Sequence, residues 1–168
     1  MQTRLLSLSH SLGELLSQRN LRLATAESCT GGQLAQVITA IPGSSQWFDR
    51  GFVSYSNIAK QEMLGVSLTT LNNFGAVSIQ TAQEMAKGAL THSHADLSLA
   101  VTGIAGPGSA SLEKPVGTVC FAWTGINFTT HTQEQLFQGD RLNIRDQAAE
   151  FALQTLIKFV KEKKLSVK

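Results

Sequence analysis

The chain has 168 residues, of which 42% are hydrophobic and 15% charged, so it can bury one substantial core and is expected to form a single domain over residues 1–168. Its apolar runs are too short to span a membrane, and the opening MQTRLLSLSHSLGELL has no continuous apolar block. We therefore expect no membrane segment and no secretion signal, which favours a cytoplasmic protein.

The net charge of +2 arises from the end of the chain. Five of the 14 basic residues fall in the last 11 positions, beside one acid, leaving nine basic and eleven acidic residues elsewhere. These five are Lys158, Lys161, Lys163, Lys164 and Lys168. The pattern indicates a solvated helix end rather than a basic face, so nucleic acid is not an expected partner.

The first half of the chain alternates between helix and strand patterns. Leucines spaced by three and four residues predict an amphipathic helix over residues 5–16. A short strand is predicted over 21–26, a helix over 31–41 and a second strand over 51–56. A further helix is predicted over 57–64, with Asn57 as its N-cap.

The second half adds a longer helix that Ser78 caps, running to about residue 90, and a strand over 96–103. A Gly/Pro-rich loop over 103–117 follows, then strands over 116–123 and 128–138 and a last helix from near Asp140. This order predicts an α/β fold, a three-layer sandwich with a mixed, largely parallel central sheet flanked by helices. Ligands of such sheets bind beyond the carboxyl ends of the strands.

The segment ESCTGG joins a predicted strand to a predicted helix. Free N–H groups at the helix start, around Gly31 and Gly32, could hold a phosphate or an oxyanion. Ser28 is the most plausible nucleophile, but a serine hydroxyl needs a base at neutral pH. The simpler interpretation is an ordinary strand–helix turn in which Thr30 caps the helix.

Lys60 is the favoured base, because none of the four histidines is suitably placed. It falls in the first turn of a helix that follows a strand, where burial and the helix N-terminus would lower its pKa. Tyr55, the only tyrosine, ends that strand and could relay a proton. The alternatives are an exposed helical lysine and a tyrosine packed in the core.

The two cysteines show no metal-ligand or disulfide spacing. Cys120 lies in the apolar run VGTVCFAW and is predicted to be a core residue. Cys29 stays open as an alternative nucleophile, although its side chain should point away from that of Ser28. The spacing His92-x-His94-x-Asp96 is set aside as a metal site, so no metal and no other cofactor are expected.

The loop GIAGPG offers backbone N–H groups from Gly103 to Gly106, including that of Ala105, for contact with a ligand. Arg141 and Arg145, at the start of the last helix, could grip a phosphate. The alternative is that both arginines only face solvent.

Five motifs together resemble one known family. They are TAESCTGG (25–32), PGSSQWFDRGFVSYSNIAK (42–60), VTGIAGPG (101–108), KPVGTV (114–119) and FQGDRLNIRDQA (137–148). Their order and identity closely resemble the C-terminal domain family of the competence-damage protein CinA, over about residues 5 to 160. The length resembles the stand-alone members, without the N-terminal domain of two-domain relatives.

The resemblance implies hydrolysis of the carboxamide of nicotinamide mononucleotide to nicotinic acid mononucleotide and ammonia, as part of pyridine-nucleotide salvage. The family's serine, tyrosine and lysine match Ser28, Tyr55 and Lys60. We expect Thr30, Gly31, Gly32, Gly103, Ala105, Gly106 and Arg141 to bind the substrate. The first choice for its phosphate is Arg141.

Two other functions stay open at this stage. The chain could be a catalytically silent module that binds a pyridine nucleotide, although none of the three catalytic positions is lost. It could also be a partner of DNA uptake or repair proteins, which its charge distribution does not support. A homo-oligomer is the expected assembly.

Overall fold

A computed structural model of the chain describes residues 2–108 and 111–162. Its centre is a sheet with strand order β2-β1-β3-β4-β5. The strands are β1 (Leu23–Glu27), β2 (Phe48–Val53), β3 (Leu97–Gly103), β4 (Thr118–Gly125) and β5 (Phe128–Leu136). β1 pairs in parallel with β2 and β3, whereas β3–β4 and β4–β5 are antiparallel. The predicted mixed α/β sheet is confirmed.

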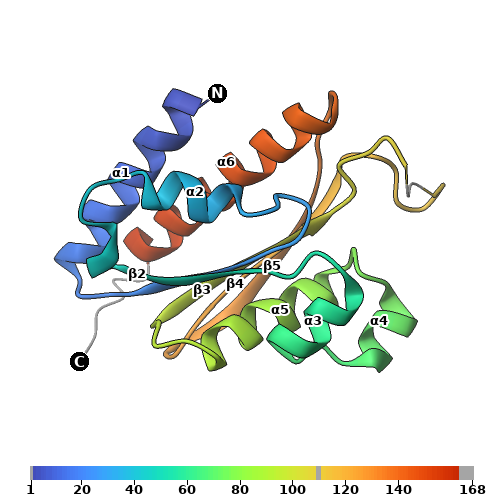
Figure 1. Ribbon diagram of the computed structural model, residues 1–168, viewed down its shortest axis with the longest axis horizontal. Coiled ribbons are helices and arrows are strands. Elements are labelled where there is room, and N and C mark those ends of the chain that lie inside the picture. Colours follow the sequence, from blue (N-terminus) through green and yellow to red (C-terminus); the bar gives the residue numbers. More distant parts are fainter. Residues whose placement is uncertain (1, 109–110, 163–168) are drawn as a thin grey trace.

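Helices cover both faces of this sheet (Figure 1). One layer contains α1 (Gln2–Gln18), α2 (Gln33–Thr39) and α6 (Arg141–Glu162). The other contains α3 (Asn57–Leu64), α4 (Leu68–Phe74) and α5 (Ile79–Thr91). The three layers match the predicted sandwich. No described helix is both long enough and apolar enough to cross a membrane.

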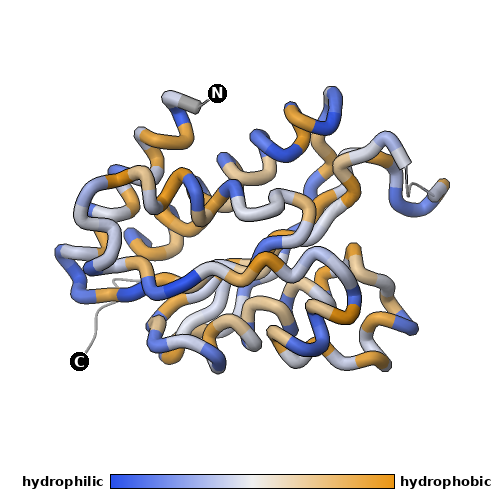
Figure 2. Tube along the Cα trace, viewed as in Figure 1, coloured by the Kyte–Doolittle hydropathy of each residue, from blue (hydrophilic) through white to orange (hydrophobic). Residues whose placement is uncertain are grey.

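The sheet separates two cores of different character. The core beneath α1, α2 and α6 is rich in leucines and aromatic rings, and Phe121 and Trp123 on β4 stack there with ring centroids 5.6 Å apart. The core beneath α5 consists mostly of small side chains, including Ala82, Ala86 and Cys120. Cys120 is thus a core residue, as predicted. Hydrophobic and hydrophilic residues alternate along the helices, which is typical of helices packed on one side (Figure 2).

Three local predictions were wrong. β2 begins and ends three residues earlier than predicted, and the cap of α3 is Ser56, whose hydroxyl accepts the N–H of Ala59 at 3.0 Å, rather than Asn57. The helix α4 was not predicted. By contrast, Ser78 caps α5 as expected, accepting the N–H of Thr81.

Parts of two predicted features lie outside the described residues. These are positions 109 and 110 of the Gly/Pro-rich loop and Lys163, Lys164 and Lys168 of the basic tail.

The connections around β1 position the site. The link through α2 to β2 runs over one face of the sheet, and the link from β2 through α3, α4 and α5 to β3 runs over the other. Because β1 runs parallel to both β2 and β3, the carboxyl ends of these three strands lie at the same edge of the sheet. A crevice forms at such a point, where neighbouring connections leave in opposite directions.

Candidate active site

Ser28 is the first residue after β1. Its N–H donates to the carbonyl of Val101 on β3 at 2.9 Å, which extends the strand pairing by one residue and fixes the serine at the sheet edge. Only 7% of its surface is exposed. The predicted nucleophile is therefore held by backbone and partly shielded from water.

Lys60 reaches this serine from α3. Its Nζ lies 2.8 Å from the Oγ of Ser28, 3.0 Å from the carbonyl oxygen of Ser54 and 3.2 Å from that of Tyr55. The side chain is only 1% exposed. The structure therefore brings together the two residues that the sequence analysis paired, 32 positions apart, and the alternative of an exposed helical lysine is wrong.

Burial lowers the pKa of Lys60, because the charged form loses its hydration. The Cys29 thiol opposes this shift only when it is ionised. Two N–H groups of the amine can donate to the carbonyls of Ser54 and Tyr55. In the neutral amine the lone pair is then left facing Ser28, where it can accept the hydroxyl proton.

Cys29 lies beside Ser28 and lines the same cavity. Burial raises the pKa of its thiol to about 12, and the nearby carboxylate of Glu27 acts in the same direction. A thiol with this pKa is protonated at neutral pH, so it is a weak nucleophile. The contact of Lys60 with the Oγ of Ser28, beside a Cys29 thiol that stays protonated, favours Ser28 as the nucleophile.

The start of α2 is arranged differently from the prediction. The buried carboxylate of Glu27 accepts the N–H groups of Gly32, Leu34 and Ala35 at 3.1, 3.0 and 2.9 Å. These donors are therefore not available to a substrate anion. Glu27 is a residue whose role sequence reasoning missed, although a carboxylate near a helix N-terminus is favoured by the helix dipole.

Consequently the structure does not bring Thr30, Gly31 and Gly32 to the Ser28 cavity. Gly31 and Gly32 line a separate cavity of about 220 Å³ together with Arg145. The carbonyl of Thr30 accepts a hydrogen bond from Arg145, and its buried hydroxyl caps nothing among the described residues. These three residues thus lie apart from the Ser28 cavity, and the substrate-binding role expected of them stays a prediction.

The loop after β3 forms another wall of the Ser28 cavity. Gly103, Ala105 and Gly106 all line it, as predicted. Gly106 has a φ of +79°, and a Cβ there would lie 2.7 Å from the side chain of Val116, so both conformation and space require glycine. Within the described chain, the N–H groups of Ala105 and Gly106 have no partner and can bind a ligand.

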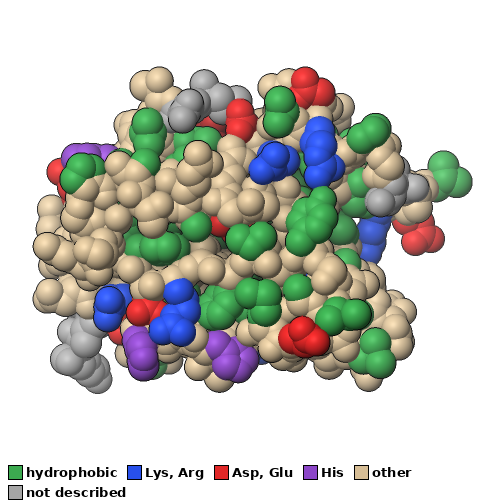
Figure 3. Space-filling model, viewed as in Figure 1, with side chains coloured by type: hydrophobic (Ala, Val, Ile, Leu, Met, Phe, Trp, Pro, Cys, Tyr) green, Lys and Arg blue, Asp and Glu red, His purple; other side chains and the backbone are tan. Residues whose placement is uncertain are grey.

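Arg141, the first residue of α6, also lines the cavity. Its guanidinium donates to the carbonyl of Gly106 at 2.7 Å and to the hydroxyl of Tyr55 at 3.0 Å. Tyr55 is 60% exposed, so it is not the core residue of the alternative interpretation. Its hydroxyl bonds to neither Ser28 nor Lys60. Lys and Arg side chains gather at the beginning of α6, beside hydrophobic side chains at the end of β2 (Figure 3).

These segments enclose a cavity of about 410 Å³. This lies in the range of about 300–1,000 Å³ that is typical of small-molecule sites. Its lining includes Lys114, Thr102 and the loop 75–77, which sequence reasoning did not assign. Only Lys114 gave a usable signal, as a cation in a loop that follows a strand. In residues 2–108 and 111–162, no three His, Cys, Asp or Glu side chains form a metal-binding group.

Comparisons with known proteins agree with this arrangement. The profile of the CinA C-terminal domain matches residues 5–160. Nicotinamide-nucleotide amidohydrolase PncC of Enterobacter agglomerans is 52% identical over 161 residues, covering 95% of this chain and 98% of that protein. PncC of Escherichia coli strain K12 is 51% identical, with 90% and 92% coverage.

The fold agrees with solved structures as well. The competence/damage inducible protein CihA from Agrobacterium tumefaciens superposes with a TM-score of 0.90 at 46% identity, covering 92% of this chain and 94% of that one. A CinA superfamily protein from Escherichia coli gives a TM-score of 0.89 at 39% identity, covering 92% and 90%. With the profile match over nearly the whole chain, these likenesses place the protein in the CinA C-terminal domain family.

Proposed function

We propose that this protein hydrolyses the carboxamide of nicotinamide mononucleotide to nicotinic acid mononucleotide and ammonia. The observation that carries the proposal is the 2.8 Å contact between the Nζ of buried Lys60 and the Oγ of Ser28, inside a cavity of nucleotide-binding size. The PncC relatives are nicotinamide-nucleotide amidohydrolases, which supports the same substrate. We also propose that the protein forms a homo-oligomer and is cytoplasmic. Its mass in solution tests the oligomer, and cell fractionation tests the location.

The first step is acyl transfer to the serine. Neutral Lys60 takes the hydroxyl proton of Ser28, and the Oγ attacks the carboxamide carbon. The direct contact makes a relay through Tyr55 unnecessary. Negative charge develops on the carboxamide oxygen, and the unpartnered N–H groups of Ala105 and Gly106 are the donors for it in this cavity.

The second half of the cycle returns the enzyme to its starting state. Protonated Lys60 gives its proton to the leaving nitrogen, the C–N bond breaks and ammonia departs, leaving an acyl ester on Ser28. A water molecule then attacks that ester while Lys60 accepts its proton. Lys60 returns that proton to the Oγ of Ser28 as the tetrahedral intermediate collapses and the bond between Oγ and the acyl carbon breaks. One amide and one water thus give one acid and one ammonia, with Ser28 protonated and Lys60 neutral again.

The phosphate of the substrate is assigned to Arg141. Its guanidinium lines the cavity, keeps unused N–H donors and has no carboxylate within 4.0 Å in the described part of the chain. The hydroxyl of Tyr55 accepts one Arg141 N–H and so orients the guanidinium toward the cavity. In this assignment Tyr55 acts on binding rather than on proton transfer.

The test is ammonia release from nicotinamide mononucleotide by the wild-type protein, Ser28→Ala and Lys60→Ala. We expect release by the wild type and a loss of at least about a hundredfold in each variant, because nucleophile and base are both removed. Ser7→Ala and Lys87→Ala change exposed residues outside the cavity and serve as matched controls. Circular dichroism verifies folding.

Three results would contradict the proposal in different ways. Nucleotide binding without ammonia release would support the silent binding module instead. Activity that survives loss of Ser28 would move the nucleophile to Cys29. Activity that survives loss of Lys60 would remove the base from the mechanism.

A further inference from the structure

The lining of the Ser28 cavity carries charge of one sign only. Its cationic side chains are Lys60, Lys114 and Arg141, and no Asp or Glu is among the described residues that line it. Lys60 is already engaged by the Oγ of Ser28 and by the carbonyls of Ser54 and Tyr55. The positive charge that is left for a ligand therefore belongs to Arg141 and Lys114.

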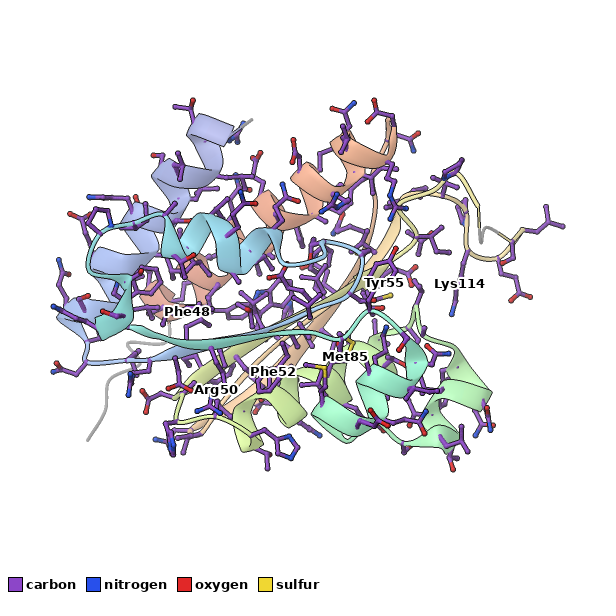
Figure 4. The ribbon with its side chains drawn as sticks, in the orientation of Figure 1. Phe48, Arg50, Phe52, Tyr55, Met85 and Lys114 are labelled. Atoms are coloured by element: carbon purple, nitrogen blue, oxygen red, sulfur yellow. The ribbon has the colours of Figure 1, made fainter. Side chains whose placement is uncertain are left out.

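Lys114 lines the same cavity as Arg141 but comes from a different segment of the chain. It reaches from the loop after β3 toward α4, whereas Tyr55, the partner of Arg141, lies at the end of β2 (Figure 4). The Nζ of Lys114 donates to the carbonyls of Phe74 and Val77 at 2.9 and 2.6 Å. One carbonyl belongs to the residue before the loop 75–77 and the other to the last residue of that loop, which is itself part of the cavity lining.

The backbone of Lys114 is fixed as firmly as its side chain. The N–H of Ser111 donates to the carbonyl of Lys114 at 2.9 Å, and the N–H of Lys114 donates to the hydroxyl of Ser111 at 3.1 Å. The ammonium therefore occupies a defined position. Two of its three N–H groups go to carbonyls, and no described carboxylate pairs with it, so one donor and the full charge remain for a ligand.

We propose that Lys114 is a specificity-determining residue that contacts the phosphate of the substrate together with Arg141. A phosphomonoester carries about 1.5 to 2 negative charges at pH 7, which the two cations that line this cavity can balance. This inference rests on the proposed function and names the part of the nucleotide that the second cation recognises. It implies that the cavity selects the phosphorylated nucleotide over its riboside.

A purely architectural role has a different signature. If Lys114 only clamped the loop 75–77 to the loop 111–114, its loss would loosen the cavity for every ligand equally. If it contacts phosphate, its loss must weaken the phosphorylated ligand selectively. The ratio of kcat/KM for nicotinamide mononucleotide to that for nicotinamide riboside therefore separates the two roles.

The experiment measures that ratio for the wild type, Lys114→Met, Lys114→Arg and the exposed control Lys87→Met. We expect Lys114→Met to lower the ratio about tenfold, the size of one charge-assisted hydrogen bond, while Lys114→Arg retains most of it. Lys87→Met should match the wild type. An equal loss for both substrates in Lys114→Met would overturn the proposal.

Binding tests the inference without turnover. Calorimetry on Ser28→Ala, alone and combined with Lys114→Met, gives the affinities for the nucleotide and the riboside. Selective loss of nucleotide affinity supports the phosphate contact even if the wild type releases no ammonia, in which case only the proposed reaction fails. Affinities that fall by the same factor would overturn the contact whatever the catalytic result.

Discussion

At the scale of single residues, Lys60 shows how burial converts an ordinary side chain into a base. The carbonyls of Ser54 and Tyr55 satisfy two of its N–H groups and keep it at the serine. They do not pair its charge as a carboxylate would, and none of the described residues that line the cavity is an acid. The charged form is therefore the one that the folded state disfavours, and the neutral amine is ready to accept a proton.

This burial makes stability depend on pH in a defined direction. Because the pKa of Lys60 is lower in the folded state than its ordinary value of 10.5, the unfolded chain binds more protons between those two values. The free energy of unfolding of the wild type should thus rise with pH across that window, relative to Lys60→Met. Urea unfolding at a series of pH values from 6 to about 10 measures this difference.

Lys87→Met provides the comparison, because Lys87 is exposed on α5. Its difference from the wild type should stay flat over the same pH series. A flat difference for Lys60→Met as well would mean that Lys60 titrates alike in both states, and the argument for a neutral base would lose its physical basis.

At the scale of elements, α2 depends on one side chain that precedes it. It has only seven residues, and three of the N–H groups around its start donate to the carboxylate of Glu27. The same residue is the covalent neighbour of Ser28, and its carbonyl accepts the N–H of Ser54 at 2.9 Å. Glu27 therefore connects the helix, the nucleophile and the segment that leads to Lys60.

Glu27→Ala should lower both stability and turnover. The change leaves the N–H groups of Gly32, Leu34 and Ala35 without an acceptor in a buried site, at a cost of at least about 2 kcal/mol. Urea unfolding measures the stability, and ammonia release gives kcat. Glu14→Ala, at an exposed position on α1, is the control. A loss no larger than that of Glu14→Ala would show that the three bonds contribute little.

The elements also show where sequence reasoning succeeds. Helices with a clear apolar period and a capping serine, such as α5 after Ser78, were predicted correctly. The predicted bounds of the strand β2 were three residues too late, because its sequence FDRGFV lacks a clean alternation of apolar and polar residues. The helix α4, LTTLNNF, has Thr and Asn of low helix propensity and is stabilised by the Ser67 cap and the buried Leu71.

The candidate site divides in the same way. Ser28 and Lys60 could be predicted because both follow strands that end at one sheet edge. The contact of Lys114 with Phe74, separated by 40 residues, depends on how two loops pack and has no local pattern. The hydrogen bonds from the start of α2 to the carboxylate of Glu27 were not predicted. The glycines before that helix, Gly31 and Gly32, fit a site for an external anion equally well.

At the scale of the whole molecule, the two cores differ in how they tolerate change. Large rings fill the core beneath α6, where Trp123 packs near Phe121 and Phe151 and donates its indole N–H to the carbonyl of Ala152. On the other side, a Cβ on Gly88 of α5 would lie 1.9 Å from the carbonyl oxygen of Leu64. Large side chains fill the core beneath α6, whereas packing on the other side depends on the close approach of the α5 backbone to that of Leu64.

Trp123→Ala should therefore destabilise the protein by about 3–5 kcal/mol, since truncating a large buried aromatic leaves a cavity. Chemical unfolding followed by far-UV circular dichroism measures this. Ile126→Ala, in the exposed turn between β4 and β5, should change stability by less than about 0.5 kcal/mol. Similar values for the two variants would show that the aromatic cluster around Trp123 is not the main core.

The pairing of Lys60 with Ser28 also makes the cavity a target for covalent chemistry. A pyridine-3-boronic acid has the shape of the nicotinamide ring, and its trigonal boron accepts an oxygen lone pair. Addition of Ser28 would form a tetrahedral boronate whose oxygen can meet the free N–H groups of Ala105 and Gly106. Lys60, which is 1% exposed, stays shielded from acylating reagents. Inhibitor design should thus begin with compounds that add reversibly to Ser28 rather than with reagents that modify Lys60.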